Sequence, residues 1–166
     1  YPASYDSANV IAVGASDATD ALTEFSNYGP GSVDLAAPGD YVFSTYKLFG
    51  GSLDDYAWLS GTSMSTPHVA GVAGLLFGLQ PGWTYQQVRQ RILGTARSVA
   101  ALAGTSVTAG VLDVRAALDG VPSAGGGGRE ELGRELLHAE AVIVVAGQLP
   151  RHHPGHPRGP QQNDHE

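Results

Sequence analysis

A long uncharged segment constrains this chain of 166 residues more than any other feature. No residue between Tyr56 and Val88 carries a formal charge, and residues 69–79 are an unbroken run of apolar side chains and glycine. The run is too short for a membrane helix, which needs about 20 apolar residues. A helix that is apolar on all sides is normally buried. The segment therefore predicts a buried core helix, in which Gly71, Gly74 and Gly78 let another backbone approach closely.

Short β-type runs precede and follow this segment. Residues 10–15, 33–37 and 41–45 are apolar or β-branched runs next to turn residues, and they predict strands. Gln87, three residues after Thr84, forms the pattern of a capping box at the start of a second helix. Residues 114–118 predict a third, short helix. Strands that alternate with helices indicate an α/β fold.

Composition excludes several classes of function. The net charge is −7, and no basic cluster exists to neutralise phosphates, which argues against nucleic-acid binding. The chain has no cysteine, so disulfides, zinc–thiolate sites and thiol catalysis are excluded. No apolar run is long enough to predict a membrane partner.

The composition changes near residue 122. Residues 125–128 are four consecutive glycines, and we interpret residues 123–128 as a flexible linker. Residues 129–166 are then an extension, expected to be partly helical and then disordered. Residues 141–146 equally fit a strand. The histidines after residue 150 also permit metal binding, although a disordered tail fits the prolines there better. The abrupt shift in composition also raises the hypothesis of an out-of-frame reading, which peptide mass mapping of the native protein would test.

The sharpest local feature is Ser63, where the apolar run of residues 56–59 meets the predicted helix. The first N–H groups of a helix have no partner within it and carry the positive end of its dipole. A hydroxyl placed there faces a site that stabilises an oxyanion. Gly61 lets a substrate backbone approach, because it has no Cβ. The plain alternative is that Ser63 only caps the helix, as most serines at helix starts do.

The surrounding motif favours the catalytic interpretation. Residues 61–64 read Gly-Thr-Ser-Met, and residues 67–71 read Pro-His-Val-Ala-Gly. This string resembles the nucleophile segment of the subtilisin-like serine proteases, the subtilases. The resemblance extends over residues 1–120, through Tyr1-Pro2-Ala3, residues 10–15, 25–29 and 36–39, and the closing segment 110–117.

The resemblance implies a three-layer α/β fold with a mostly parallel sheet, of which this chain holds the C-terminal portion in residues 1–122. It implies a secreted serine endopeptidase that acts on proteins or peptides. Ser63 would be the nucleophile and Thr62 would support the oxyanion site. Ala3, Leu59 and Gly61 would contact substrate.

The chain lacks the other parts of such a site. In this family the aspartate and the histidine precede the serine, but residues 1–62 contain no histidine. His68 lies five residues after Ser63, which places the two side chains roughly 140° apart on a helix. We therefore interpret His68 as a buried core residue. The fragment should be inactive alone, and the N-terminal half of its own catalytic domain is the missing partner.

No cofactor is required for this chemistry, and we assign no metal ligand. The backbone near Ala3 and Tyr5 resembles a place where some relatives bind a cation, so a structural calcium ion is an expectation for the full-length parent only.

Two rival functions remain at this point. One is a non-catalytic remnant that binds peptides. The other is an esterase, whose nucleophile typically lies in Gly-x-Ser-x-Gly; the second glycine is absent here. For the fold, a sheet cut in half should leave an unpaired edge, and the helix of residues 69–79 should lose part of its burial.

Overall fold

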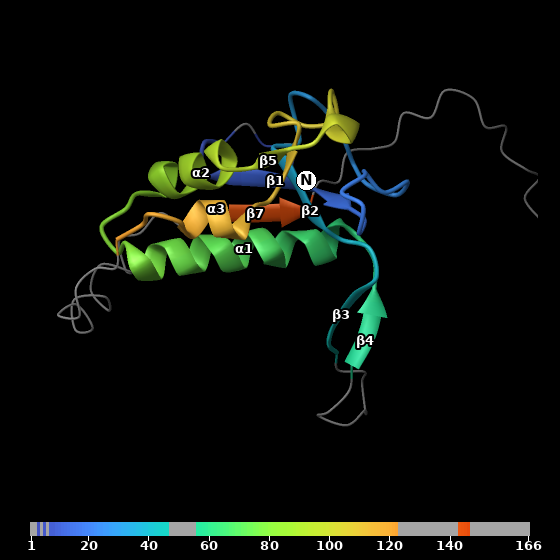
Figure 1. The fold of residues 1–166 in the computed structure, drawn as a ribbon, viewed down its shortest axis with the longest axis horizontal. Helices are drawn as coiled ribbons and strands as arrows, with labels where there is room; N and C mark the ends of the chain where they lie inside the picture. Colours follow the sequence, from blue (N-terminus) through green and yellow to red (C-terminus); the bar gives the residue numbers. More distant parts are fainter. Residues whose placement is uncertain (1–2, 4, 6, 47–55, 123–142, 147–166) are drawn as a thin grey trace, which may run out of the picture.

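The computed structural model describes residues 3, 5, 7–46, 56–122 and 143–146. Its main element is a five-stranded sheet in the order β5-β6-β2-β1-β7 (Figure 1). The strands of this sheet are β1 (Val10–Ser16), β2 (Leu35–Pro38), β5 (Arg97–Ser98), β6 (Gly110–Val111) and β7 (Ile143–Ala146). Strands β6, β2, β1 and β7 are parallel, and only β5 is antiparallel, to β6. The expected α/β fold with a mostly parallel sheet is confirmed.

Three helices pack against the sheet: α1 (Thr62–Leu79), α2 (Tyr85–Gly94) and α3 (Val114–Leu118). Buried side chains of all three form one cluster with Ile11 and Val13 of β1 and Leu35 of β2. On the other face, Ala36 packs with Leu102 of the short 3₁₀ helix η1 (Ala100–Leu102) and with Val111. In the described part of the chain, α1, α2 and α3 therefore cover one face of the sheet, and the short η1 lies on the other face. The described residues contain no second full layer of helices.

Helix α1 is buried on one side only. The burial all round that its apolar run predicts does not occur among the described residues, whereas the partial loss of burial expected for a divided sheet does. The buried residues follow helical spacing: Thr62, Ser65, Val69, Val72, Ala73 and Leu76. The opposite side holds Leu75, which is 53% exposed. A Cβ placed on Gly71, Gly74 or Gly78 would meet no described atom within 4 Å. The close approach predicted from these glycines therefore does not occur within the described residues.

The two later helices begin as the sequence predicted. Thr84 and Gln87 form a capping box at the start of α2, and Asp113 caps α3 by accepting the Ala116 N–H at 2.8 Å. Arg91 of α2 then donates to the carbonyl oxygens at the end of α3, of which Ala117 is at 2.8 Å. A cation near a helix C-terminus is stabilising, since the last carbonyl groups lack partners within the helix.

Strand β7 comes from the predicted extension and joins the main sheet. It pairs with the first half of β1, in the register Val10↔Ile143 to Val13↔Ala146. The strand interpretation therefore holds for residues 143–146, and β7, not β1, is the last strand on this side of the described sheet. Residues 123–142 and 147–166, where we predicted the linker, the helix and the disordered tail, lie outside the described residues.

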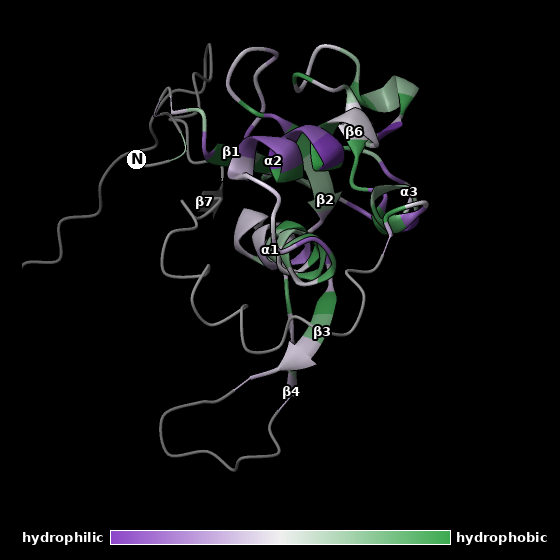
Figure 2. Cartoon of the chain, turned by 90° about the vertical axis from the view of Figure 1, so that its left-hand side faces the viewer, coloured by the Kyte–Doolittle hydropathy of each residue, from purple (hydrophilic) through white to green (hydrophobic). Residues whose placement is uncertain are grey.

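Strands β3 (Val42–Thr45) and β4 (Tyr56–Leu59) form a separate antiparallel ribbon. This ribbon extends away from the sheet, below α1 in Figure 1, and leads directly into the start of α1. In Figure 2 the first part of β3 has the green colour of apolar residues, and its arrowhead is pale. Phe43 stacks on Tyr56, with ring centroids 5.4 Å apart, and its ring is tilted against that of Trp58, with centroids 4.8 Å apart.

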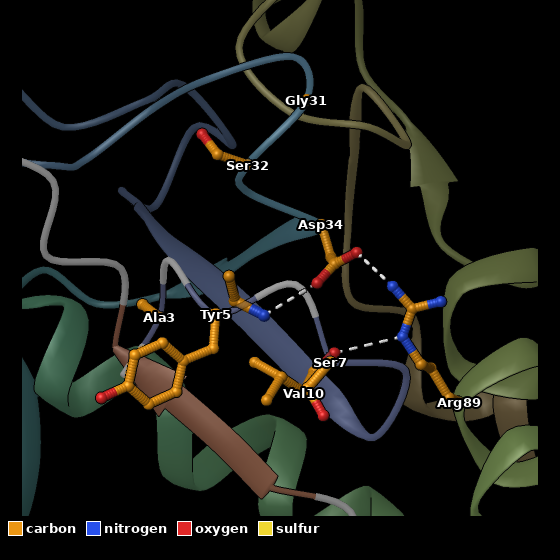
Figure 3. Close-up of a pocket in the computed structure, with 9 residues that line it drawn as sticks. Ala3, Tyr5, Ser7, Val10, Gly31, Ser32, Asp34 and Arg89 are labelled. Atoms are coloured by element: carbon orange, nitrogen blue, oxygen red, sulfur yellow. Dashed lines mark hydrogen bonds and ion pairs between the residues drawn. The ribbon is translucent and has the colours of Figure 1, made fainter. Parts of the chain in front are cut away.

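A partly buried ion pair ties α2 to the sheet (Figure 3). One carboxylate oxygen of Asp34 accepts from Arg89 at 2.7 Å, and the other accepts the backbone N–H of Ala12 at 2.8 Å. Arg89 also donates from Nε to the Val10 carbonyl oxygen at 3.2 Å. The Asp34 carboxylate is therefore satisfied on both oxygens, which is what a mostly buried charge requires.

A second tight junction connects the ends of β1 and β2 with the start of α1. Gly39 follows β2; its N–H donates to the Ser16 carbonyl at 2.9 Å, and its own carbonyl accepts the Gly61 N–H at 2.7 Å. A Cβ on Gly39 would lie 2.1 Å from Ser65 Oγ, 2.7 Å from Ala15 Cβ and 2.9 Å from the Gly61 carbonyl oxygen. No other residue type fits here, and the junction fixes where α1 begins.

We predict that Asp34→Asn destabilises the protein by about 2 kcal/mol in urea unfolding. The asparagine side chain keeps its size, but its NH₂ group must face either Arg89 or the Ala12 N–H, both of which are donors. The matched control is Asp20→Asn, which breaks the exposed ion pair with Arg97 and should cost at most about 1 kcal/mol. Equal losses of stability in the two variants would contradict the claim that Asp34 ties α2 to the sheet.

We predict that Gly39→Ala destabilises the protein by about 1–3 kcal/mol, because two of the three contacts are with a methyl group and a backbone oxygen that cannot rotate away. Gly74→Ala is the control of opposite sign: its Cβ meets nothing described, and alanine raises helix propensity by about 1 kcal/mol. Thermal unfolding measures both changes. A neutral Gly39→Ala would show that the junction is loose.

Candidate active site

Ser63 lies in the first turn of α1, beyond the carboxyl ends of β1 and β2. The Gly39 junction places it there, since Gly39 bonds to Ser16 at the end of β1 and to Gly61 just before the helix. Open parallel sheets commonly bind ligands outside the carboxyl ends of their strands. The position of Ser63 is therefore that of a site residue in this class of fold.

The capping alternative for Ser63 fails. The N-cap of α1 is Gly61, with φ 158° and ψ 161°, and no side chain caps the helix. This conformation is essentially restricted to glycine. The Ser63 side chain is exposed, and its Oγ makes no hydrogen bond with any residue that the structure describes. The hydroxyl is thus available to a ligand.

Backbone groups around Ser63 are also unpaired within the described chain. The Met64 and Ser65 N–H groups bond to the Gly61 carbonyl, at 2.9 and 3.4 Å, whereas no described acceptor takes the Ser63 N–H. Pro67 lies inside α1 and has no N–H, so the Ser63 carbonyl lacks its usual helical donor. Pro67 is the sixth residue of α1. A free N–H at a helix start is suited to an anion.

Thr62 is buried beside Ser63, and its carbonyl accepts from the Thr66 hydroxyl at 2.9 Å. Ser65 is completely buried, and its Oγ has no hydrogen-bond partner in the described structure. The buried side of this turn is thus held by close packing, with Gly39 against Ser65. Such packing keeps the exposed side chain in one place.

Two residues that the sequence analysis missed close the loop next to Ser63. Ser60 donates to the Asp40 carboxylate at 2.7 Å and accepts the Tyr41 N–H at 2.9 Å. These bonds join the base of the β3–β4 ribbon just before Gly61. The turn at residues 38–40 was visible in the sequence, but nothing in it linked Asp40 to a serine 20 residues later.

The structure corrects the burial of His68. Its side chain is exposed, not buried in the core, and Nδ1 lies 2.9 Å from the Met64 carbonyl oxygen, one turn back. The absence of a contact with Ser63 agrees with the rotation expected on a helix.

The predicted substrate-contacting residues fall into two places. Leu59 and Gly61 lie next to Ser63 along the chain, at the end of β4 and at the N-cap of α1. Ala3 is buried and lines a cavity of about 290 Å³ beside the first half of β1, with Tyr5, Val10 and Asp34 (Figure 3). Ser63 does not line that cavity. The described contacts therefore do not bring Ala3 to Ser63, and the substrate role of Ala3 stays a prediction.

The same cavity lies where the sequence resembles a cation site of some relatives, near Ala3 and Tyr5. The Tyr5 carbonyl accepts the Ser7 N–H at 2.9 Å, and the Asp34 carboxylate that lines the cavity is engaged by Arg89. Among the described residues, no group of three or more His, Asp or Glu side chains is placed to hold a metal ion. The structural calcium ion expected for the full-length parent therefore stays a prediction.

Comparison with known proteins supports the resemblance. The model of the Subtilase family, Peptidase S8, matches residues 1–127. Subtilisin BL of Lederbergia lenta is 48% identical over 99 residues, which are 60% of this chain and 34% of that protein. Thermitase of Thermoactinomyces vulgaris is 48% identical over 99 residues, or 60% of this chain and 32% of that protein. This chain thus spans about a third of the length of these relatives.

One relative is named for its location. The halolysin-like extracellular serine protease Nep of Natrialba magadii is 46% identical over 96 residues, 58% of this chain and 16% of that protein. In the described part of this chain, no helix has the length and apolar character needed to cross a membrane.

Solved structures match the fold as well. A structure titled as proteases from Pseudoalteromonas arctica gives a TM-score of 0.60 at 32% identity, covering 70% of this chain and 37% of that one. A subtilase cytotoxin structure gives a TM-score of 0.60 at 20% identity, covering 83% of this chain and 44% of that one, and supports the fold alone. Because the family model matches residues 1–127, which are most of this chain, the chain belongs to the subtilase family of serine peptidases.

Proposed function

We propose that this chain carries the nucleophile of a serine endopeptidase and that Ser63 attacks the scissile carbonyl of a peptide substrate. The observation that carries the proposal is the exposed Ser63 hydroxyl at the start of α1, inside the Gly61–Met64 motif and beside an unpaired N–H. Membership of the subtilase family supports the same chemistry.

The first step forms a bond between Ser63 Oγ and the carbonyl carbon. The carbonyl oxygen becomes an oxyanion, and the Ser63 N–H is placed to donate to it at the positive end of α1. The Oγ proton passes to a base, which returns it to the leaving amine as the peptide bond breaks. Water then releases the acyl group from Ser63. Gly61 leaves room for the substrate backbone, and Thr62 holds the turn from its buried side.

The base must come from outside residues 1–62, because that segment has no histidine. In the chain order of subtilases, the orienting aspartate precedes that histidine. His68 does not serve, since its ring is hydrogen-bonded one turn back along the exposed helix side. We propose that the N-terminal half of the catalytic domain, in a longer form of the protein, supplies both groups. The 166-residue chain is then inactive alone, and protein or peptide substrates bind only to the completed site.

The remaining assignments follow from this role. The relatives include a protease named as extracellular, which supports a secreted location for this protein. The proposed hydrolysis uses side chains, backbone groups and water, and requires no cofactor. Leu59 lines the leaving-group side, and Ala3 belongs to the pocket for the residue before the cleaved bond. The second candidate is a remnant that binds peptides without catalysis. The observation that favours it is the absence of a histidine from residues 1–62.

We predict that Ser63→Ala in the longer protein lowers kcat by about 10⁶-fold, the loss found when the nucleophile of subtilisin itself is removed. Hydrolysis of a fluorogenic peptide measures it. Ser98→Ala, an exposed serine on β5, is the matched control, and His68→Gln tests the nearest histidine; both should keep kcat within a few-fold.

The isolated 166-residue chain should show no hydrolysis above the Ser63→Ala background. Ser63-dependent hydrolysis by this chain alone would overturn the claim that the base lies elsewhere. A longer protein that binds the peptide but does not cut it would favour the binding remnant instead.

A further inference from the structure

The ribbon of β3 and β4, which points away from the main sheet in Figure 1, carries three aromatic side chains on one face. Phe43 lies opposite Trp58 across the ribbon, and Tyr56 lies opposite Thr45. Directly opposite residues share a face, and so do alternate residues along a strand, so Phe43, Tyr56 and Trp58 lie on the same face. They are 54%, 59% and 62% exposed. We call these three rings the aromatic face of the ribbon.

The contacts among the three rings support the ribbon but do not account for their exposure. Phe43 contacts both of the other rings. Cross-strand aromatic pairs stabilise a sheet, and a two-stranded ribbon needs such support. More than half of each residue nevertheless remains exposed within the described structure. Burial of this apolar surface against a partner would be favourable.

The base of the ribbon is fixed to the turn that carries Ser63. Strand β4 leads through Ser60 and the N-cap residue Gly61 into α1. The Ser60 hydroxyl donates to the Asp40 carboxylate at 2.7 Å and accepts the Tyr41 N–H at 2.9 Å, so it joins the two sides of the base. These bonds hold the aromatic face in a constant position relative to the nucleophile.

The aromatic face also begins close to the nucleophile along the chain. Trp58 and Ser63 are five positions apart. An extended chain covers at most about 3.6 Å per residue, so the Cα atoms of these two residues lie within about 18 Å of each other. A substrate strand that passes Ser63 and continues beside the ribbon therefore reaches Trp58 with about five residues.

The composition of the ribbon indicates which segment fits it. None of the eight residues of β3 and β4 is charged. Aromatic rings pack well against apolar and other aromatic side chains. A charged segment would lose solvation here and find no opposite charge on either strand. Leu59, at the end of β4, has the leaving-group side in the proposed function, so the ribbon continues from that side of the cleaved bond.

We propose that the aromatic face is a specificity surface for the leaving-group part of a polypeptide substrate, where it selects apolar or aromatic side chains about five residues after the cleaved bond. The inference rests on the proposed function of Ser63 and names a substrate class for that site. Phe43 and Trp58 are its main determinants, because Phe43 contacts both other rings and Trp58 is the ring nearest to Ser63 along the chain.

The test uses the longer protein and three substrates that are identical before the cleaved bond. The first has a small anilide leaving group and no residue after the bond. The second continues for seven residues, with leucine, phenylalanine and leucine at the fourth to sixth positions, and the third has serine at those positions. The variant is Phe43→Thr with Trp58→Thr, which keeps β-branched residues in both strands. The matched control is Val107→Thr with Val114→Thr, at two exposed apolar residues outside the ribbon.

We expect the unchanged protein to cut the apolar peptide with a kcat/KM about ten-fold above that for the serine peptide. The double variant should lower this preference to two-fold or less, mainly through a higher KM for the apolar peptide. Its kcat/KM for the anilide should stay within two-fold, which shows that it folds with an intact site. Trp58→Thr alone leaves the Phe43–Tyr56 contact in place and should lower the preference in the same direction if the double variant is unstable. The control should keep the full preference.

Three results overturn the inference while the proposed function stands. One is cleavage of the anilide by the unchanged protein without a preference for the apolar peptide. Another is an equal loss of kcat/KM for all three substrates in both ribbon variants, which would show that the rings only support the ribbon. The third is an absent preference together with a dimer that the double variant does not form, which would identify a second copy as the occupant. Failure to cut any of the three substrates, the anilide included, would overturn the proposed function and this inference with it.

Discussion

The contact of Gly39 with Ser16, Gly61 and Ser65 is the constraint on which the rest of the site depends. Its two backbone hydrogen bonds, of 2.9 and 2.7 Å, join the end of β1 to the turn before α1. Its missing Cβ lets Ser65 pack against the same point. As a result the first turn of α1 lies against the carboxyl ends of two parallel strands, with Ser63 on its outer side. A nucleophile needs such fixed placement, because small displacements cost reaction rate.

One part of the described structure is well packed, and another part exposes apolar surface to which further polypeptide can bind. Helices α1, α2 and α3 cover one face of β1 and β2. In contrast, α1 has an exposed apolar side, and the β3–β4 ribbon exposes Phe43, Tyr56 and Trp58. Large exposed apolar surfaces commonly mark places where other protein surfaces bind. These features agree with a chain that spans about a third of the length of its relatives.

The sequence predicted the local elements well, because each had a local cause. The apolar run of residues 10–15 gave β1, and Thr84 with Gln87 gave the capped start of α2. Ser63 was identified from a motif of adjacent residues, and its position at a helix start follows from the same motif. What the sequence could not predict were contacts between distant residues. The Ser60–Asp40 bond and the Asp34–Arg89 pair join residues 20 and 55 positions apart, and no local pattern encodes them. The burial of α1 and His68 was misjudged for the same reason, since a uniformly apolar helix gives no sign of which side faces the sheet.

The central claim is that Ser63 is a nucleophile whose base and carboxylate lie in an upstream part of the same catalytic domain. Sequencing the coding DNA upstream of Tyr1 tests it most directly. The account predicts an open reading frame that supplies an aspartate and then a histidine before Ser63, in the chain order of subtilases. A start codon just before Tyr1, with neither residue upstream, would contradict it and leave a subtilase-like remnant without a catalytic base.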